Sequence, residues 1–309
     1  MDNRQPMTQG QDSEQGAQDL MPELRLVRAD NPSALTGSGT NTYLLGRGDV
    51  VVIDPGPALP DHLRAILAAL HPGERISAIL VTHTHLDHSA LAGPLAQRTA
   101  APVLGFGPAG SGRSAAMTRA AALGLTGGGE GVDRQFEPDR RLHDGESLTL
   151  AGQRIEVLHT PGHTGCHLAF GWQDRLFAGD HVMGWSTSLV SPPDGDMTDY
   201  VATLHRLARR QWSVIHPGHG DTVTDPAGRI SELIAHRMAR EGEILAALTE
   251  GPATAAGLAA RIYTRTAPGL LAAASRNVLA HLVDLAEQGL VTTPQGVTAD
   301  SAFRLCGAV

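Results

Sequence analysis

The sequence contains no lysine, and all 24 of its basic residues are arginine. Chemistry that requires a lysine side chain, such as Schiff-base catalysis or a Walker-type phosphate loop, is therefore excluded. The two cysteines, Cys166 and Cys306, are too few for a disulfide framework and form no metal-type pair, so we expect ordinary thiols. The formal charge of -8 disfavours a strongly attractive field for nucleic acid and leaves open only a local basic groove.

Long apolar runs are also lacking. No stretch approaches the roughly 18 apolar residues that a membrane-spanning helix needs, and residues 1–22 are polar, without the apolar run of a secretory signal. We therefore expect a disordered tail over residues 1–22, no membrane partner and a cytoplasmic protein. The rest of the chain is long enough for one large and one smaller domain, and a hydrophobic content of 41% allows a substantial core.

Metal-binding side-chain types are concentrated in the segment 83–88 (HTHLDH), directly after an apolar, strand-like run. His83 and His85 point the same way if this segment is extended, because side chains alternate along a strand. Asp87 and His88 follow where the chain should turn into a helix, which directs them towards a neighbouring position. Such a cluster at the end of a buried strand can hold a divalent metal rigidly enough to activate water, and its layout suggests a second metal.

Three later segments place a further ligand type after a strand-like run. His163 follows IEVLHTPG, Asp180 ends the run LFAG, and His219 follows VIHPG. His163 would complete a three-histidine site, and His219 would fill the second site. Asp180 is the candidate bridge, because each oxygen of a carboxylate can bind one cation.

The order of these residues resembles the signature of the metallo-β-lactamase superfamily over about residues 24–225: His-x-His-x-Asp-His, a later His, an Asp and a last His. The resemblance implies an α/β fold, an αββα sandwich of two β-sheets flanked by helices, with two metals at one edge. The ligand roles that it implies are, for metal one, His83, His85 and His163; for metal two, Asp87, His88 and His219; and for the bridge, Asp180.

The chain is more similar still to one branch, the β-lactamase-like protein 2 group, through the stretches 82–89, 179–187 and 192–196. An animal member of this group is known as an endoribonuclease for single-stranded RNA, so the resemblance favours a phosphodiester substrate. A thioesterase of the glyoxalase II type shares the same ligands and differs around Asp180, which makes thioester hydrolysis the alternative. The expected partner is thus a small-molecule or single-stranded nucleic-acid substrate.

The donor set predicts a hydrolase with two divalent metal ions. Imidazoles helped by carboxylates suit Zn2+, and Fe or Mn would also be accepted. Two cations lower the pKa of a bridging water towards neutrality, and the resulting hydroxide is the expected nucleophile. Asp87 is the candidate catalytic residue, and loss of turnover in Asp87→Ala with the fold retained would support a hydrolase.

Five further residues are candidates for supporting the metals or contacting the substrate. Asp54 follows the strand-like run VVI and can fix the tautomer of a ligating imidazole, or can simply form a turn before proline. His181, Ser186 and Thr187 stand beside or beyond the bridging carboxylate and can contact substrate or donate a proton. Trp185 can stack on a base or close the core, and we favour packing.

The pattern beyond about Pro226 changes to helices followed by a hairpin, the order of a winged helix. The expected helices and hairpin span 229–249, 254–263, 270–288 and 290–298. Residues 228–309 contain seven arginines and seven acidic residues, so the positive excess of a groove reader is missing. We therefore expect no sequence-specific DNA binding. The predicted domains are a catalytic domain over 23–226 and a winged-helix-like packing domain over 227–309.

The segment 105–131 is rich in glycine, so we expect a mobile loop that serves either as a spacer or as a flap over the substrate. Two interpretations without catalysis stay open. A metal-stabilised scaffold would need closed coordination, which is hard to reconcile with ligands shared by two metals. A winged-helix DNA-binding regulator would need a basic recognition helix, and 270–288 is not basic.

Overall fold

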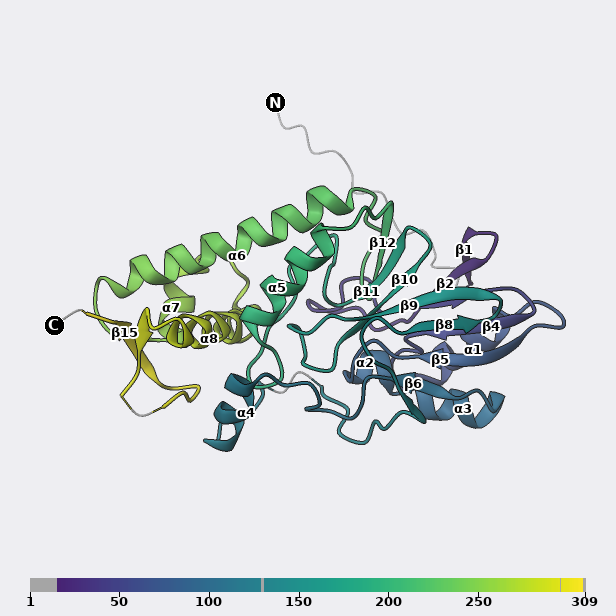
Figure 1. Ribbon diagram of the computed structural model, residues 1–309, viewed down its shortest axis with the longest axis horizontal. Helices are drawn as coiled ribbons and strands as arrows, with labels where there is room; N and C mark the ends of the chain where they lie inside the picture. The colour runs from purple at the N-terminus through teal and green to yellow at the C-terminus, as the bar shows by residue number, and fades with distance from the viewer. Residues whose placement is uncertain (1–15, 129–130, 295, 308–309) are drawn as a thin grey trace, which may run out of the picture.

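The computed structural model describes residues 16–128, 131–294 and 296–307. In this part of the chain two large β-sheets stack face to face, and helices cover both outer faces (Figure 1). A smaller helical domain with its own short sheet lies at one end. None of the helices described is both long and apolar enough to cross a lipid bilayer.

The first sheet has the strand order β1-β2-β3-β4-β5-β6-β7 among the described residues. Its pairs are antiparallel from β1 to β4 and parallel from β4 to β7. Because β4 and β5 are parallel neighbours, the residues that follow them meet at the same edge. Its elements are β1 (Gln18–Met21), β2 (Leu24–Arg28), β3 (Asn41–Leu45), β4 (Asp49–Ile53), β5 (Arg75–Leu80), β6 (Val103–Gly105) and β7 (Arg140–Arg141), with helices α1 (Pro60–Ala68), α2 (Leu86–Ser89) and α3 (Ala92–Thr99).

The second sheet has the strand order β12-β11-β10-β9-β8, and β11 and β12 are parallel. Helices α5 and α6 cover its outer face (Figure 1). Its elements are β8 (Ser147–Leu150), β9 (Gln153–His159), β10 (Leu168–Trp172), β11 (Arg175–Gly179) and β12 (Val214–Pro217), with helices α5 (Met197–Ala208) and α6 (Pro226–Leu248).

The apolar runs of the first sheet serve two cores at once. Val51 of β4 faces the space between the sheets, where it joins Phe170 and Phe177 of the second sheet. Its neighbour Val52 points the other way, into a second core with Leu95 of α3 and other residues of the outer helices. This alternation explains why a strand buried on both faces is apolar throughout.

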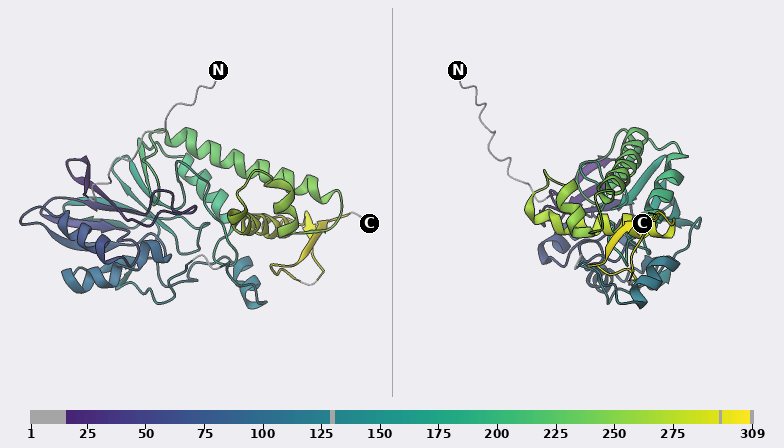
Figure 2. Two further views of the ribbon diagram at one scale, coloured as in Figure 1. Left: turned by 180° about the vertical axis from the view of Figure 1, so that it is seen from behind. Right: turned by 90° about the vertical axis from the view of Figure 1, so that its left-hand side faces the viewer.

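The C-terminal domain is joined to the sandwich by the long helix α6 (Figure 2). Ile230 and Leu233, in the first half of α6, pack in the core outside the second sheet. Ile244 and Leu248, in its last two turns, pack in the core of the C-terminal domain. The helix therefore contributes to the cores of both domains. The remaining elements are β13 (Ala253–Thr254), α7 (Ala255–Ile262), the 3-10 helix η1 (Pro268–Leu270), α8 (Leu271–Glu287), β14 (Val291–Thr292) and β15 (Ala302–Leu305).

The expectation of a disordered tail over residues 1–22 is wrong at its C-terminal end. Residues 18–21 form β1, which pairs with β2 and places Leu20 and Met21 against the core between the sheets. A short edge strand of this kind carries only two apolar residues, too few to stand out in the sequence. Residues 1–15 lie outside the described part of the chain.

Two other expectations need correction. The hairpin expected within 290–298 is longer, because β14 pairs with β15 at residues 302–305 and Pro294 cannot donate a ladder hydrogen bond. The segment 105–131 is not simply a mobile loop, because it contains helix α4 (Ala115–Ala122), which begins with Ser114 as its N-cap. Ala120 of α4 packs in the core of the C-terminal domain, so the segment connects the two domains.

Candidate metal centre

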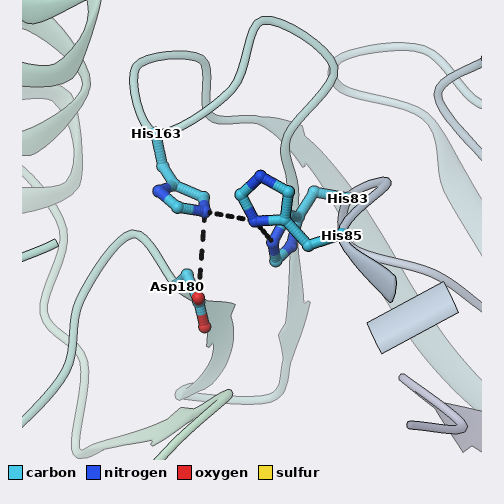
Figure 3. Close-up of side chains that lie close together, drawn as sticks. All are labelled: His83, His85, His163 and Asp180. Carbon is cyan, nitrogen blue, oxygen red and sulfur yellow. Dashed lines mark hydrogen bonds and ion pairs between the residues drawn. The ribbon is translucent and has the colours of Figure 1, made fainter. Parts of the chain in front are cut away.

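The side chains predicted as metal ligands converge at the edge of the sandwich where β5, β11 and β12 end. Their donor atoms form two groups, in each of which all lie within 4.8 Å of one another. Figure 3 shows the first group, with its imidazoles and carboxylate turned towards one another. We call the groups the three-histidine group (His83, His85, His163 and Asp180) and the second group (Asp87, His88 and His219).

Hydrogen bonds set the tautomers in the three-histidine group. Nδ1 of His83 lies 3.0 Å from the Thr82 hydroxyl, and Nδ1 of His163 donates to the Leu189 carbonyl at 2.6 Å. Their Nε2 atoms consequently carry lone pairs, and both face Nδ1 of His85, at 3.0 and 3.1 Å. One proton on Nδ1 of His85 can satisfy only one of these two contacts. A cation between the three nitrogen atoms would accept the lone pairs of all three.

The second group has the same design. Nδ1 of His88 lies 3.0 Å from the Asp54 carboxylate, and Nδ1 of His219 faces the Gly39 carbonyl at 3.2 Å. The two Nε2 atoms therefore point inwards, 3.2 Å apart. Asp87 brings a carboxylate oxygen to within 3.2 Å of Nε2 of His219. Two imidazole lone pairs and one carboxylate thus meet at one point.

Asp180 of the three-histidine group also reaches the second group. Its Oδ1 is 3.3 Å from Nε2 of His88 and 3.4 Å from Nε2 of His219, while its Oδ2 is 3.8 Å from Nε2 of His163. Oδ1 is buried and has no hydrogen-bond partner among the described residues. A buried oxygen without a donor is costly unless a cation accompanies it. The donors present, five imidazoles and two carboxylates, fit two divalent cations.

The electrostatics of the first group favour neutral imidazoles. Burial, followed by the neighbouring histidines, lowers the pKa of His83 well below its usual value. Burial and then His163 lower the pKa of His85 to about 3. Neutral imidazoles keep their lone pairs at physiological pH, as a metal ligand must.

The second group is dominated by carboxylates. Burial alone would lower the pKa of His88, but the carboxylates of Asp180, Asp87 and Asp54 outweigh burial and raise it well above the usual value. In the same way burial would raise the pKa of Asp87, but the charges of its histidine neighbours lower it to about 2. This end of the site therefore attracts positive charge, in the form of a proton or a metal cation.

The Asp54 carboxylate contacts residues that belong to, or hold in place, both metal-ligand groups. Its carboxylate accepts hydrogen bonds from the backbone N–H of Thr82 at 2.7 Å and from the Thr82 hydroxyl at 2.8 Å, besides its contact with His88. The residue also turns the chain, with a φ of 52° at the end of β4. The two interpretations of this residue from the sequence, support and turn, are therefore compatible.

His167 is a supporting residue that the sequence analysis misses. Its Nε2 accepts from the backbone N–H of Asp180 at 3.2 Å, and its Nδ1 contacts the Thr160 hydroxyl at 2.7 Å. Its ring stacks on His83 with centroids 5.1 Å apart. Gly179 makes room for it, because a Cβ at that position would lie 2.7 Å from Nε2 of His167. No strand-end spacing marks His167, which stands on the turn before β10.

The remaining candidates differ in placement. Ser186 and Thr187 line a cavity above the two groups. Trp185 does not close the core, because it is 45% exposed and covers Gly37 and Gly220. His181 does not line this cavity: it is 0% exposed and packs on Tyr200 with ring centroids 4.6 Å apart.

The cavity above the metal-ligand groups has a volume of about 260 Å³ and lies between the sandwich and the C-terminal domain. It adjoins a larger groove of about 800 Å³, with which it shares Ala34, Leu35, Leu189, Leu270 and Ala273. No sequence motif marks the part that the C-terminal domain plays in this cavity. The C-terminal domain supplies one wall of the cavity through Tyr263, Thr266, Leu270, Ala273, Ala274 and Asn277.

Comparison with known proteins assigns the class of protein to which this fold and this set of candidate ligands belong. The family model of the metallo-beta-lactamase superfamily matches residues 35–219, and a model of the beta-lactamase associated winged helix domain matches residues 254–296. The chain belongs to the metallo-beta-lactamase superfamily and is one of its hydrolases. The predicted αββα sandwich with a C-terminal winged helix is thus confirmed.

Individual relatives agree with this assignment. A beta-lactamase-like protein 2 homolog of Drosophila melanogaster is 31% identical over 88% of this chain and 90% of its own length. An atrochrysone carboxyl ACP thioesterase of Aspergillus chevalieri is 29% identical over 78% of this chain and 70% of its own. The crystal structure of a metallo-beta-lactamase family protein from Thermus thermophilus has a TM-score of 0.74 and 29% identity, and the match covers 92% of this chain and 99% of that one.

Proposed function

We propose that this protein is a hydrolase of acyl thioesters that depends on two divalent cations, with Zn2+ as the metal. The observation that carries the proposal is the lining of the cavity. Among the described residues that line it there is no arginine, and the apolar members Leu35, Met183, Leu189 and Leu270 lie around the metal-ligand groups. An acyl chain is bound by apolar surface, whereas a polyanionic strand requires cationic groups along its path.

The adjoining groove supports an apolar substrate. Its floor is formed by small side chains of α7 and α8, among them Ala256, Ala259 and Ala260. Arg276 also lies at this groove, but its guanidinium donates to the Ser191 hydroxyl and to backbone carbonyls, which engage it within the protein. A thioesterase among the relatives adds to the preference for this substrate class.

The metals would be held by the two groups described above, with Asp180 of the first group reaching into the second. Divalent cations bound there would supply a water of lowered pKa and would polarise the carbonyl oxygen of the thioester. The chain contributes orientation: Asp87, whose side chain is 27% exposed, stays ionised and presents a carboxylate at the cavity wall. Ser186 and Thr187 offer hydroxyl donors to the substrate from the same wall.

Phosphodiester hydrolysis is the second candidate, and the hydroxyl groups of the cavity are the observation that favours it. Ser186, Thr187 and Thr266 can each donate a hydrogen bond to a phosphoryl oxygen. These donors are neutral, so the metals alone would balance the charge of the phosphate. For that reason we place the phosphodiester second.

The test uses the full-length protein loaded with Zn2+. Turnover is measured with acyl-coenzyme A thioesters of increasing chain length, with bis(p-nitrophenyl) phosphate and with single-stranded RNA. We expect metal-dependent thioester hydrolysis that D87A abolishes, whereas D61A, which removes an exposed carboxylate of α1, leaves it unchanged. Faster turnover of either phosphodiester would reverse the order of the candidates. No metal-dependent turnover in any assay would favour the scaffold interpretation.

A further inference from the structure

The segment 183–191, which follows Asp180, is held by side chains of the C-terminal helices. Arg229 at the start of α6 donates to the carbonyls of Met183 at 2.8 Å and Ser186 at 2.6 Å. Asn277 of α8 accepts from the backbone N–H of Val190 at 2.9 Å. Between these points Arg237 of α6 donates to the Ser188 carbonyl. The segment therefore takes its conformation largely from α6 and α8.

The opposite side of the same segment fixes two residues of the three-histidine group. The Leu189 carbonyl accepts from Nδ1 of His163 at 2.6 Å and so sets the tautomer of that imidazole. The Ser188 hydroxyl donates to the backbone carbonyl of Asp180. A single stretch of chain, Ser188 to Leu189, thus links Arg237 to two of the predicted ligands.

Arg237 is an unusual residue for a helix that serves only to pack. Its side chain is 1% exposed, and no carboxylate among the described residues forms an ion pair with it. Its guanidinium lies 4.9 Å from the centre of the Tyr200 ring, and Nη1 lies 3.4 Å from the Asn277 side-chain oxygen. A buried charge without a counter-ion is costly, and an apolar side chain could fill the space without that cost. The guanidinium is, however, suited to fixing a carbonyl in direction.

We propose that Arg237 is a positioning residue of the metal centre. By holding the Ser188 carbonyl it orients the Leu189 carbonyl towards His163 and the Ser188 hydroxyl towards Asp180. The C-terminal domain is then a part of the metal centre rather than an attached reader of nucleic acid. The proposal rests on the metal centre of the proposed function and is independent of the substrate.

The experiment measures Co2+ binding to the metal-free full-length protein, because the visible absorption bands of Co2+ report the arrangement of its ligands. In R237M we expect affinity for Co2+ to fall by about 10- to 100-fold and the bands to change, the usual effect of losing a residue that orients a ligand. R237K, which keeps a donor but not the planar fork, should recover part of the affinity and shift the bands back.

R240M is the matched control. Arg240 stands one turn further along α6, with its guanidinium 4.8 Å from the centre of the Tyr263 ring and an ion pair to Glu243. We expect R240M to bind Co2+ with the affinity and bands of the unmodified protein. A role of Arg237 in stability alone would lower the unfolding midpoint in R237M and leave the bands unchanged, and that result would overturn the proposal.

Two further outcomes are distinguished by the same titration. If R237M does not fold, S188A decides, because it removes only the hydroxyl that donates to the Asp180 carbonyl. Weakened binding with altered bands in S188A supports the proposal, and unchanged binding overturns it. If the unmodified protein binds no Co2+ at all, the metal centre itself, and with it the proposed function, is wrong.

Discussion

The Asp54 carboxylate lies 3.0 Å from Nδ1 of His88 and also accepts two hydrogen bonds from Thr82, whose hydroxyl in turn faces Nδ1 of His83. Asp54 directly follows β4, and Thr82 lies two residues after the end of β5, which is the parallel neighbour of β4. One buried carboxylate thus orients an imidazole in each of the two metal-ligand groups. This connection explains how the two groups keep a fixed relation to each other.

Replacement of Asp54 by asparagine tests that connection. An amide nitrogen cannot accept the hydrogen bonds that a carboxylate oxygen accepts, so His88 or Thr82 loses its partner. We expect D54N to bind Zn2+ about 10- to 100-fold more weakly than the unmodified protein. A competition titration with a chromophoric chelator measures this change. D61N on α1 is the control, and equal affinity in D54N and D61N would show that Asp54 serves only as a turn residue.

Gly179 provides a second prediction. Its φ is +47°, and a Cβ there would lie 2.7 Å from Nε2 of His167 and 2.8 Å from the Thr82 hydroxyl. The cost of the left-handed backbone and of the overlap should together destabilise G179A by about 3 kcal/mol. In G145A, φ is +76° and no atom of the described residues lies within 4 Å of the added Cβ, so this variant carries only the backbone cost of about 1 kcal/mol. Urea unfolding measures both, and equal losses would contradict the steric argument.

The members of the two metal-ligand groups could be predicted from the sequence because they obey local rules. His83 and His85 alternate along an extended segment, and Asp180 ends an apolar run, so each is marked by its neighbours in sequence. Arg237 and the cavity wall could not be found in this way. Arg237 contacts Ser188 across the two domains, and such a contact depends on how α6 packs, which no periodicity encodes. The placement of Trp185 could not be predicted for a similar reason, because the glycines against which it lies belong to distant segments.

Acid should destabilise the protein through buried histidines outside the metal centre. His281 of α8 is buried with no hydrogen bond to either ring nitrogen among the described residues, and burial followed by nearby arginines lowers its pKa to about 3. The unfolded chain, with a pKa of about 6.5, binds this proton more readily, so the free energy of unfolding falls as pH drops from about 6.5 towards 3.

The substitution H281M removes the imidazole and with it this pH-dependent contribution to the free energy of unfolding, while nearly keeping the side-chain volume. For the metal-free protein, we expect the loss in unfolding free energy between pH 6.5 and 5 to be smaller in H281M by up to about 2 kcal/mol. Urea titrations at several pH values measure the slope of the unfolding free energy against pH. H205M, which replaces an exposed histidine of α5, should leave the slope unchanged. A slope in H281M as steep as in the unmodified protein would mean that His281 is not the group that titrates.

Ala273 tests whether the cavity and the adjoining groove form one acyl-binding path, as the proposed function requires. The residue lines both spaces, so a phenylalanine side chain there would block the passage between them. We expect A273F to lose roughly 100-fold in kcat/KM for long-chain acyl thioesters, to retain activity on acetyl thioesters, and to keep the Zn2+ affinity of the unmodified protein. A122F, on an exposed face of α4, is the control. Equal losses for short and long chains would place the acyl group elsewhere, because the block would then act on the metal centre and not on chain length.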